Sequence, residues 1–183
     1  MGYKKQRIKE EYIVSKQTTN NTLYCRNCPC RIYNNSGVIR YGKGNLYADN
    51  LIILPPYQTE DLITRPVEEE LINEILSLAN IPIEDCYFTR AIKCYTKIKG
   101  IRYNAAYHCF NTIAKEILFI KPKRIICFGN EVRVYYNWFR EKLNYTGKII
   151  ILPTIMIKFY DEVSYNNIVK DLIKEYNDKD LVL

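Results

Sequence analysis

The chain has 183 residues and a formal net charge of +7, from 27 Lys and Arg against 20 Asp and Glu. This length predicts one domain with a hydrophobic core of its own. No apolar run is long enough to cross a membrane, and the N-terminal segment lacks the apolar stretch of a signal peptide, so an intracellular protein is expected. Seven Cys exclude a fully paired set of disulfides, and the single His, His108, excludes a site with several His ligands.

The first 50 residues lack a regular hydrophobic pattern. Residues 1–24 are polar and basic and predict either a mobile arm or a short helix. Residues 25–49 are rich in Gly and Asn, which favour loops. We therefore expect a basic N-terminal arm at 1–24, followed by a single folded domain at 25–183.

From residue 50 onward, short apolar runs alternate with segments of helical periodicity. The predicted strands are 51–54, 86–92, 124–128 and 148–152, and the predicted helices are 67–79, 104–119, 130–143 and 163–176. This alternation is typical of an α/β protein with βαβ units. The sequence therefore predicts a three-layer fold, in which helices flank a central, mostly parallel, four-stranded sheet.

In such a sheet, ligands bind beyond the carboxyl ends of the strands. The segments that follow the four predicted strands read LPPYQTED, RAIKCYTK, FGNE and LPTIMIKFY. The functional site is expected among these four loops.

The cysteines divide into two groups. Cys25 and Cys28 form a CxxC motif, whose spacing allows two thiolates to bind one metal ion. Cys86 and Cys127 lie in apolar strands and are expected to be small buried side chains. Cys30 is left unassigned, and either it or Cys28 is able to complete the pair.

A series of short motifs gives the chain a resemblance to a known family. CRNCP is followed by YGKGN, by Ala48-Asp49 and an apolar strand, and by a loop and an Arg65-Pro66 pair. YFTRAIKC, KPKRIICFGNE and LPTIM come later, in the same order as in the family. Over residues 25–158 the chain resembles the family 4 iron–sulfur uracil-DNA glycosylases.

The resemblance implies a 4Fe–4S cluster as cofactor. Its four thiolate ligands would be Cys25, Cys28, Cys94 and Cys109. The alternatives to this cluster are a zinc ion bound by the same cysteines, or four free thiols. The family's fold, a three-layer α/β domain, is the fold that the periodicity predicts.

The chain departs from the family at the positions that perform the chemistry. The base-pocket positions implied by the resemblance are Leu54, Tyr57, Val67, Arg90 and Met156. Val67 replaces the Phe that stacks on the flipped base, Arg90 replaces the Asn that reads the uracil edge, and Met156 replaces a His. Because Met is unable to stabilise a developing anion, ordinary uracil excision is expected to be absent or very weak.

Other residues suit contacts with nucleic acid. Basic side chains that alternate with aromatic ones favour binding to phosphates and bases. The predicted DNA-binding residues are Lys93, Lys97, Lys99, Arg102, Lys158, Phe159 and Tyr160. No catalytic residue is assigned with certainty; Glu60 and Asp61, in the first loop, are the candidates for positioning a water molecule.

Three functions are compatible with these patterns. The first is a DNA-binding protein of this superfamily that serves a replication, repair or transcription assembly, in a bacterial cytoplasm or a virus-infected host cell. The second is an active DNA glycosylase with altered base specificity. The third is a Cys-metal module that binds another protein.

Overall fold

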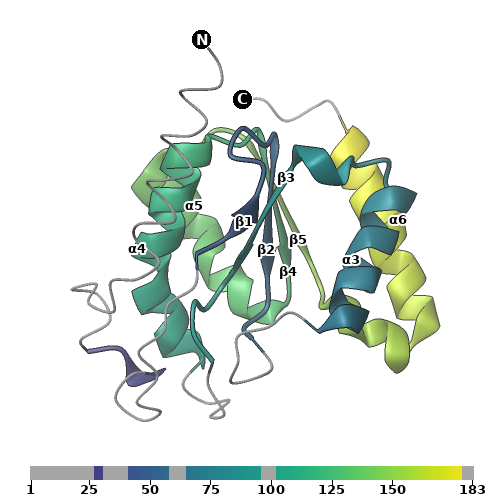
Figure 1. Cartoon of the computed structure of the whole chain (residues 1–183), viewed down its shortest axis with the longest axis horizontal. Coiled ribbons are helices and arrows are strands. Elements are labelled where there is room, and N and C mark those ends of the chain that lie inside the picture. The colour runs from purple at the N-terminus through teal and green to yellow at the C-terminus, as the bar shows by residue number, and fades with distance from the viewer. Residues whose placement is uncertain (1–26, 31–40, 58–64, 96–101, 179–183) are drawn as a thin grey trace.

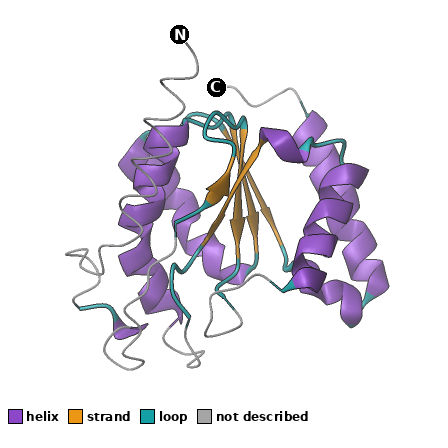
Figure 2. Cartoon of the chain, in the orientation of Figure 1, coloured by secondary structure: helices purple, strands orange, loops and turns teal. Residues whose placement is uncertain are grey.

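The computed structural model describes residues 27–30, 41–57, 65–95 and 102–178 (Figure 1). The predicted arm at 1–24 lies outside these residues. The chain forms three layers, with a sheet between two layers of helices, as Figure 2 shows.

The sheet has five strands in the order β1-β3-β2-β4-β5. Their bounds are Lys43–Gly44 for β1, Asn50–Leu54 for β2, Cys86–Arg90 for β3, Arg124–Phe128 for β4 and Lys148–Leu152 for β5. Strands β3, β2, β4 and β5 are parallel, and β1 pairs with β3 in the antiparallel direction. The sheet is therefore mixed, with a short antiparallel strand at one edge.

Four helices in the described chain flank the sheet: α3 at Pro66–Leu78, α4 at Arg102–Ile120, α5 at Tyr136–Leu143 and α6 at Glu162–Asn177. Three short 3-10 helices accompany them: η2 at Ile83–Asp85, η4 at Asn130–Tyr135 and η5 at Ile155–Phe159. Pro66 begins α3, where the missing amide proton costs no hydrogen bond, and acids occupy its first turn.

The alternation of side chains along β2 explains the two helical layers. Leu51 and Ile53 are fully buried in a core with α4 and α5, whereas Ile52 and Leu54 are buried in a second core with α3 and α6. Figure 1 accordingly shows α4 and α5 on one face of the sheet and α3 and α6 on the other. Because both faces of β2 are buried, residues 51–54 are apolar at every position.

The predicted three-layer α/β architecture and its four parallel strands are confirmed, but the predicted strand count is wrong. β1 was missed because its two residues lie in a Gly-rich stretch that has no apolar pattern. The strand predicted at 86–92 ends at Arg90, and the helix predicted at 130–143 begins as η4 before it continues as α5. The other strands and helices lie within two residues of their predicted bounds.

Candidate functional site

The four parallel strands end at one edge of the sheet, here called the carboxyl edge. Two backbone hydrogen bonds connect the segments that leave it: Ala91 N donates to Leu54 O (2.9 Å), and Gly129 N donates to Leu152 O (3.0 Å). The expected loops therefore begin side by side.

Arg90 lies at this edge, at the end of β3. Its side chain is 4% exposed, and its guanidinium group makes two parallel bonds to Glu68 of α3, with Nη1–Oε1 at 3.1 Å and Nη2–Oε2 at 2.6 Å. Nη1 also donates to the Pro55 carbonyl at 2.9 Å, and the guanidinium carbon lies 4.5 Å from the centre of the Tyr57 ring. Arg90 is thus held by the protein's own groups on several sides.

The other predicted base-pocket positions differ in burial. Leu54 is buried, and Met156 of η5 is half-buried against the same core. Tyr57 is 9% exposed and lies under Arg90. Val67 is half-buried and directly precedes Glu68. The structure therefore brings Arg90 and Tyr57 into contact and places Leu54 in the packed core, with Met156 half-buried against that core.

A second buried ion pair lies on the other face of the sheet. Lys93 Nζ lies 2.5 Å from Glu116 Oε2 of α4, and it also donates to the Thr89 hydroxyl. Thr89 donates to the same carboxylate oxygen at 2.8 Å, and the Gly42 amide donates to the other oxygen at 2.8 Å. Glu116 thereby joins α4, β3 and the segment before β1.

Gly42 is required for this arrangement. A Cβ atom at this position would lie 2.4 Å from the Phe88 carbonyl oxygen and 2.4 Å from the Tyr87 ring. Only Gly allows the backbone to approach β3 closely enough for its amide to reach Glu116. One Gly of the sequence motif at 42–44 therefore has a structural role.

The predicted role of Lys93 in binding DNA is wrong for this conformation. Its side chain is 1% exposed, and its ammonium group is neutralised by Glu116, so no phosphate can reach it. A lysine that enters the core must be paired there, because an isolated buried charge is very costly.

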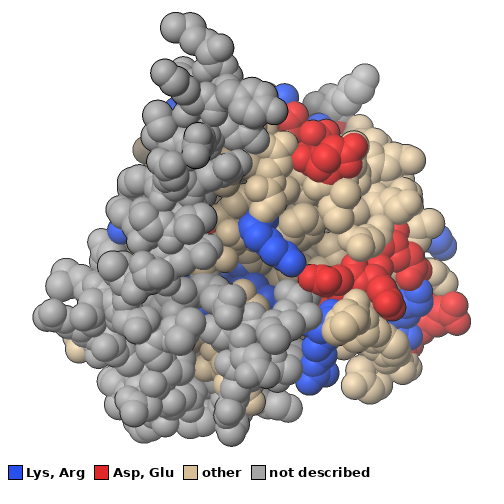
Figure 3. All heavy atoms as spheres, in the orientation of Figure 1, with Lys and Arg blue, Asp and Glu red and all other residues tan. Residues whose placement is uncertain are grey.

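The remaining predicted DNA-binding residues differ in accessibility. Phe159 is 54% exposed and Tyr160 is 89% exposed, whereas Lys158 binds Glu74 with both Nζ–O distances at 2.6 Å. Lys97 and Lys99 lie outside the described residues, and so does the side chain of Arg102. On the face shown in Figure 3, Lys and Arg side chains lie beside Asp and Glu side chains.

Three of the four predicted cluster ligands lie in one buried region. Cys28, Cys94 and Cys109 are each less than 9% exposed and belong to the same core cluster, and Cys25 lies outside the described residues. The Lys93 amide donates to Cys109 Sγ at 3.4 Å. Among the described residues, no three potential ligands converge as a metal site. Cys28, Cys94 and Cys109 are therefore buried thiols of one core, and a shared cluster stays a prediction.

The predicted packing role of Cys86 and Cys127 is confirmed. Their side chains are 1% and 0% exposed. Burial, together with the nearby Asp85 and Glu84 carboxylates, raises the pKa of Cys86 to about 12, and burial raises the pKa of Cys127 well above its usual range. Both thiols therefore stay protonated, whereas a metal ligand must be a thiolate. Cys30 is also fully buried, in the core that contains Cys28.

The structure does not describe the two residues predicted to position a water molecule. Glu60 and Asp61 lie outside the described residues. His108 is half-buried on α4, and its ring meets the Tyr107 ring edge-on, with centres 5.8 Å apart.

Sequence reasoning missed the two carboxylates that organise this edge, Glu68 and Glu116. Each lies on the apolar face of its helix, three or four residues from buried positions such as Ile72 and Ile113. An acid at such a position indicates a buried cation nearby, and this signal was available in the sequence.

No family model and no curated protein matches this chain. No helix in the described ranges is long and apolar enough to cross a membrane. The site is therefore interpreted from its own geometry.

Proposed function

We propose that this chain is a DNA-binding protein of the iron–sulfur uracil-DNA glycosylase type that does not excise uracil. It would serve a replication, repair or transcription assembly. The observation that carries the proposal is the buried Arg90–Glu68 pair at the carboxyl edge.

The ion pair occupies the position from which the related enzymes are expected to read a base. Arg90 aligns with the family Asn, and its donors are already directed to Glu68 and Pro55. An incoming base would have to displace a buried, bidentate ion pair, which leaves a charge unpaired at a cost of several kcal/mol. Val67 and Met156 supply neither a stacking ring nor a donor at their positions. A base-excision reaction is therefore disfavoured here.

The cluster cysteines support the iron–sulfur part of the proposal. When bound, a cluster would link the segment around Cys28 to the loop after β3, through Cys94, and to α4, through Cys109. The amide of Lys93 would donate to one of its sulfur ligands. Such a link would fix the segment at 27–30 to the sheet.

The exposed side chains at the end of η5 are the proposed DNA contact. Phe159 ends η5, the helix that carries Met156, Tyr160 follows it, and both side chains are exposed. An aromatic side chain at such a place can stack on an exposed base, which contributes about 1–3 kcal/mol per base.

The test for catalysis uses the purified protein and DNA duplexes that contain uracil, hypoxanthine or xanthine. We expect binding that weakens steeply with salt and no released base. Catalytic release of any base would instead support an active glycosylase with altered specificity. Absence of salt-sensitive binding would support a protein-binding module, and either result would overturn the proposal.

A matched pair of variants locates the DNA contact. Tyr160→Ser should weaken DNA binding about fivefold or more, because stacking is lost. Val163→Ser removes a side chain of comparable exposure (71%) from the next turn and should leave binding unchanged. Equal losses in the two variants would exclude a specific contact by Tyr160.

Iron analysis tests the cofactor. The wild type, purified without oxygen, should contain four iron atoms and acid-labile sulfide per cluster, as this cluster type requires. Cys94→Ser and Cys109→Ser should lose both, and Cys86→Ser should keep them because Cys86 lies in the other core. Stoichiometric zinc in place of iron would refute the cluster.

A further inference from the structure

The opposite edge of the sheet, the amino edge, carries an open groove. Two turns build its floor: residues 121–123, between α4 and β4, and residues 144–147, between α5 and β5. The Lys148 amide donates to the Lys123 carbonyl (3.1 Å), and the Tyr145 hydroxyl donates to the Pro122 carbonyl (3.1 Å). The two turns are thus fixed to each other before any ligand binds.

Gly147 is the residue that lets the turns approach. A Cβ atom there would lie 2.3 Å from the Tyr145 hydroxyl and 2.5 Å from the Lys123 carbonyl oxygen. Any other residue would force the turns apart. The floor of the groove therefore depends on this one position.

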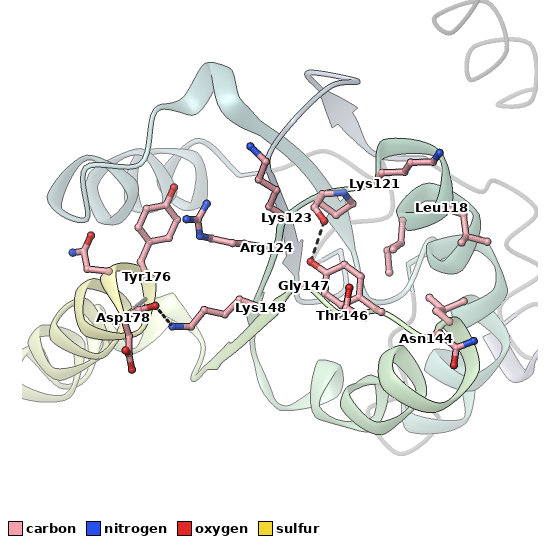
Figure 4. Close-up of a pocket in the computed structure, with 15 residues that line it drawn as sticks. Leu118, Lys121, Lys123, Arg124, Asn144, Thr146, Gly147, Lys148, Tyr176 and Asp178 are labelled. Atoms are coloured by element: carbon pink, nitrogen blue, oxygen red, sulfur yellow. Dashed lines mark hydrogen bonds between the residues drawn. The ribbon is translucent and has the colours of Figure 1, made fainter. Parts of the chain in front are cut away.

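The groove encloses about 780 Å³ between these turns and the end of α6. This volume falls in the range of roughly 300–1,000 Å³ that is typical of small-ligand sites. Figure 4 shows Arg124 and Lys148 extending toward α6, where Tyr176 faces Arg124. Leu118, which is 58% exposed, adds an apolar wall from α4.

Four cations line the groove, and two of them lack an acidic partner. Within the described ranges, no carboxylate forms an ion pair with Lys121 or Arg124. Lys123 pairs with Asp49 at 2.7 Å, with both side chains well exposed. Lys148 donates to the Asp178 carbonyl at the end of α6 and lies 3.9 Å from Glu175.

Helix ends account for some of these charges but not for all of them. Lys121 follows the last turn of α4, and Lys148 binds the end of α6, where cations balance the helix dipole. Arg124 and Lys123 belong to β4 and its preceding turn, so no dipole explains them. Arg124 instead stacks on an aromatic ring, 4.5 Å from the centre of Tyr176.

We propose that this groove binds a nucleotide unit, either free or within a single strand, with its phosphate on Lys121 and Lys123 and its base beside the Arg124–Tyr176 stack. A preformed guanidinium–ring stack offers a flat surface for a base, and unpaired cations suit a phosphate. The exposed Lys123–Asp49 pair contributes little stability, so Lys123 can exchange it for a phosphate. The groove shares no residue with the carboxyl edge, so this proposal does not depend on the function proposed above.

The test titrates the full chain with thymidine monophosphate, a short oligothymidylate and inorganic phosphate, and follows the backbone amide signals of Thr146 and Gly147. We expect thymidine monophosphate to shift both signals. Lys121→Glu should weaken its binding about tenfold or more, because a charge-assisted contact becomes a repulsion. Lys170→Glu makes the same change at an exposed lysine outside the groove and should leave the affinity within about twofold of the wild type.

A second variant separates the base from the phosphate. Tyr176→Leu should weaken thymidine monophosphate about fivefold or more and leave the affinity for inorganic phosphate unchanged. Tighter binding of the oligothymidylate with the same response to Lys121→Glu would identify a single strand as the source, and equal affinity would identify the free nucleotide. The proposal is overturned if neither nucleotide shifts the two signals. It is also overturned if Lys170→Glu weakens thymidine monophosphate binding as much as Lys121→Glu does. A third contradicting result would be polyglutamate that displaces the nucleotide and binds more tightly than it.

Discussion

The two edges of the sheet use basic residues in opposite ways. At the carboxyl edge, Arg90 and Lys93 are buried and bound to Glu68 and Glu116. At the amino edge, Lys121 and Lys123 are exposed, and Arg124 is half-buried against an aromatic ring. Basic side chains are therefore buried and neutralised at the carboxyl edge, whereas at the amino edge they are accessible to a ligand.

The difference shows that a basic stretch of the sequence does not tell which of its charges stay accessible. Lys93 lies in a basic stretch of the sequence, yet its charge is balanced inside the fold by a residue 23 positions away. At the amino edge, Lys121, Lys123 and Arg124 are neighbours in the sequence, and the fold brings Lys148 of β5 and the Tyr176 ring of α6 to them. Substitutions at one edge at a time test this contrast.

The largest effect is expected from Glu116→Ala. Among the described residues, Glu116 is the acidic partner of the buried Lys93 ammonium, so this change leaves Lys93 with the Thr89 hydroxyl alone and the Gly42 amide without its acceptor. Breaking a buried ion pair from one side costs about 3–5 kcal/mol of unfolding free energy. Denaturant titration measures this loss, and Glu69→Ala, in an exposed pair with Lys43, should change it by less than about 1 kcal/mol. Equal effects would show that burial does not matter at Glu116.

A somewhat smaller effect is expected from Glu68→Leu, at about 3 kcal/mol, because Arg90 keeps the Pro55 carbonyl and the Tyr57 ring. The double variant Glu68→Leu with Arg90→Met should recover most of this loss, since replacing both buried charges by apolar groups is often neutral. Thermal and denaturant unfolding of the four proteins form the cycle. A double variant as unstable as the sum of the two single variants would indicate that the two residues act independently.

An intermediate effect is expected at alkaline pH, from Cys86 at the amino end of β3. Burial raises its pKa from 9.0 to about 12, so between these values the unfolded thiol ionises and the folded thiol does not. The unfolded state then binds fewer protons, and this one group lowers the unfolding free energy by about 1.4 kcal/mol per pH unit above pH 9. Cys86→Ala should therefore lose stability less steeply than the wild type between pH 9 and pH 12. Identical slopes would contradict the raised pKa.

The smallest effect is expected from Asp49→Ala at the amino edge. Its pair with Lys123 is exposed, so the unfolding free energy should change by about 0–1 kcal/mol. The variant releases Lys123 and should tighten thymidine monophosphate binding a few-fold in the same titration. Unchanged or weaker nucleotide binding would place Lys123 outside the phosphate site.

Much of the fold followed from local patterns. Apolar runs such as 51–54 and 148–152 predicted buried parallel strands, and the helical periodicity placed four helices between and after them. β1 had no such pattern, because its two residues, Lys43 and Gly44, carry no apolar side chain. At the carboxyl edge, the positions of Leu54, Tyr57, Arg90 and Met156 were predicted together, but the ion pairs that occupy this edge were not. Their partners come from α3 and α4, which lie far away in the sequence.

The sequence by itself determined the alternation of strands and helices, and with it the parallel sheet and the two buried cores. Hydrophobic periodicity is a local property, and it suffices for these features because each strand or helix buries its own apolar face. The tertiary structure alone decided which charges are buried and which remain exposed. Burial of a lysine or arginine depends on whether a carboxylate from another element reaches it. Glu68 of α3 reaches Arg90 on one face of the sheet, and Glu116 of α4 reaches Lys93 on the other.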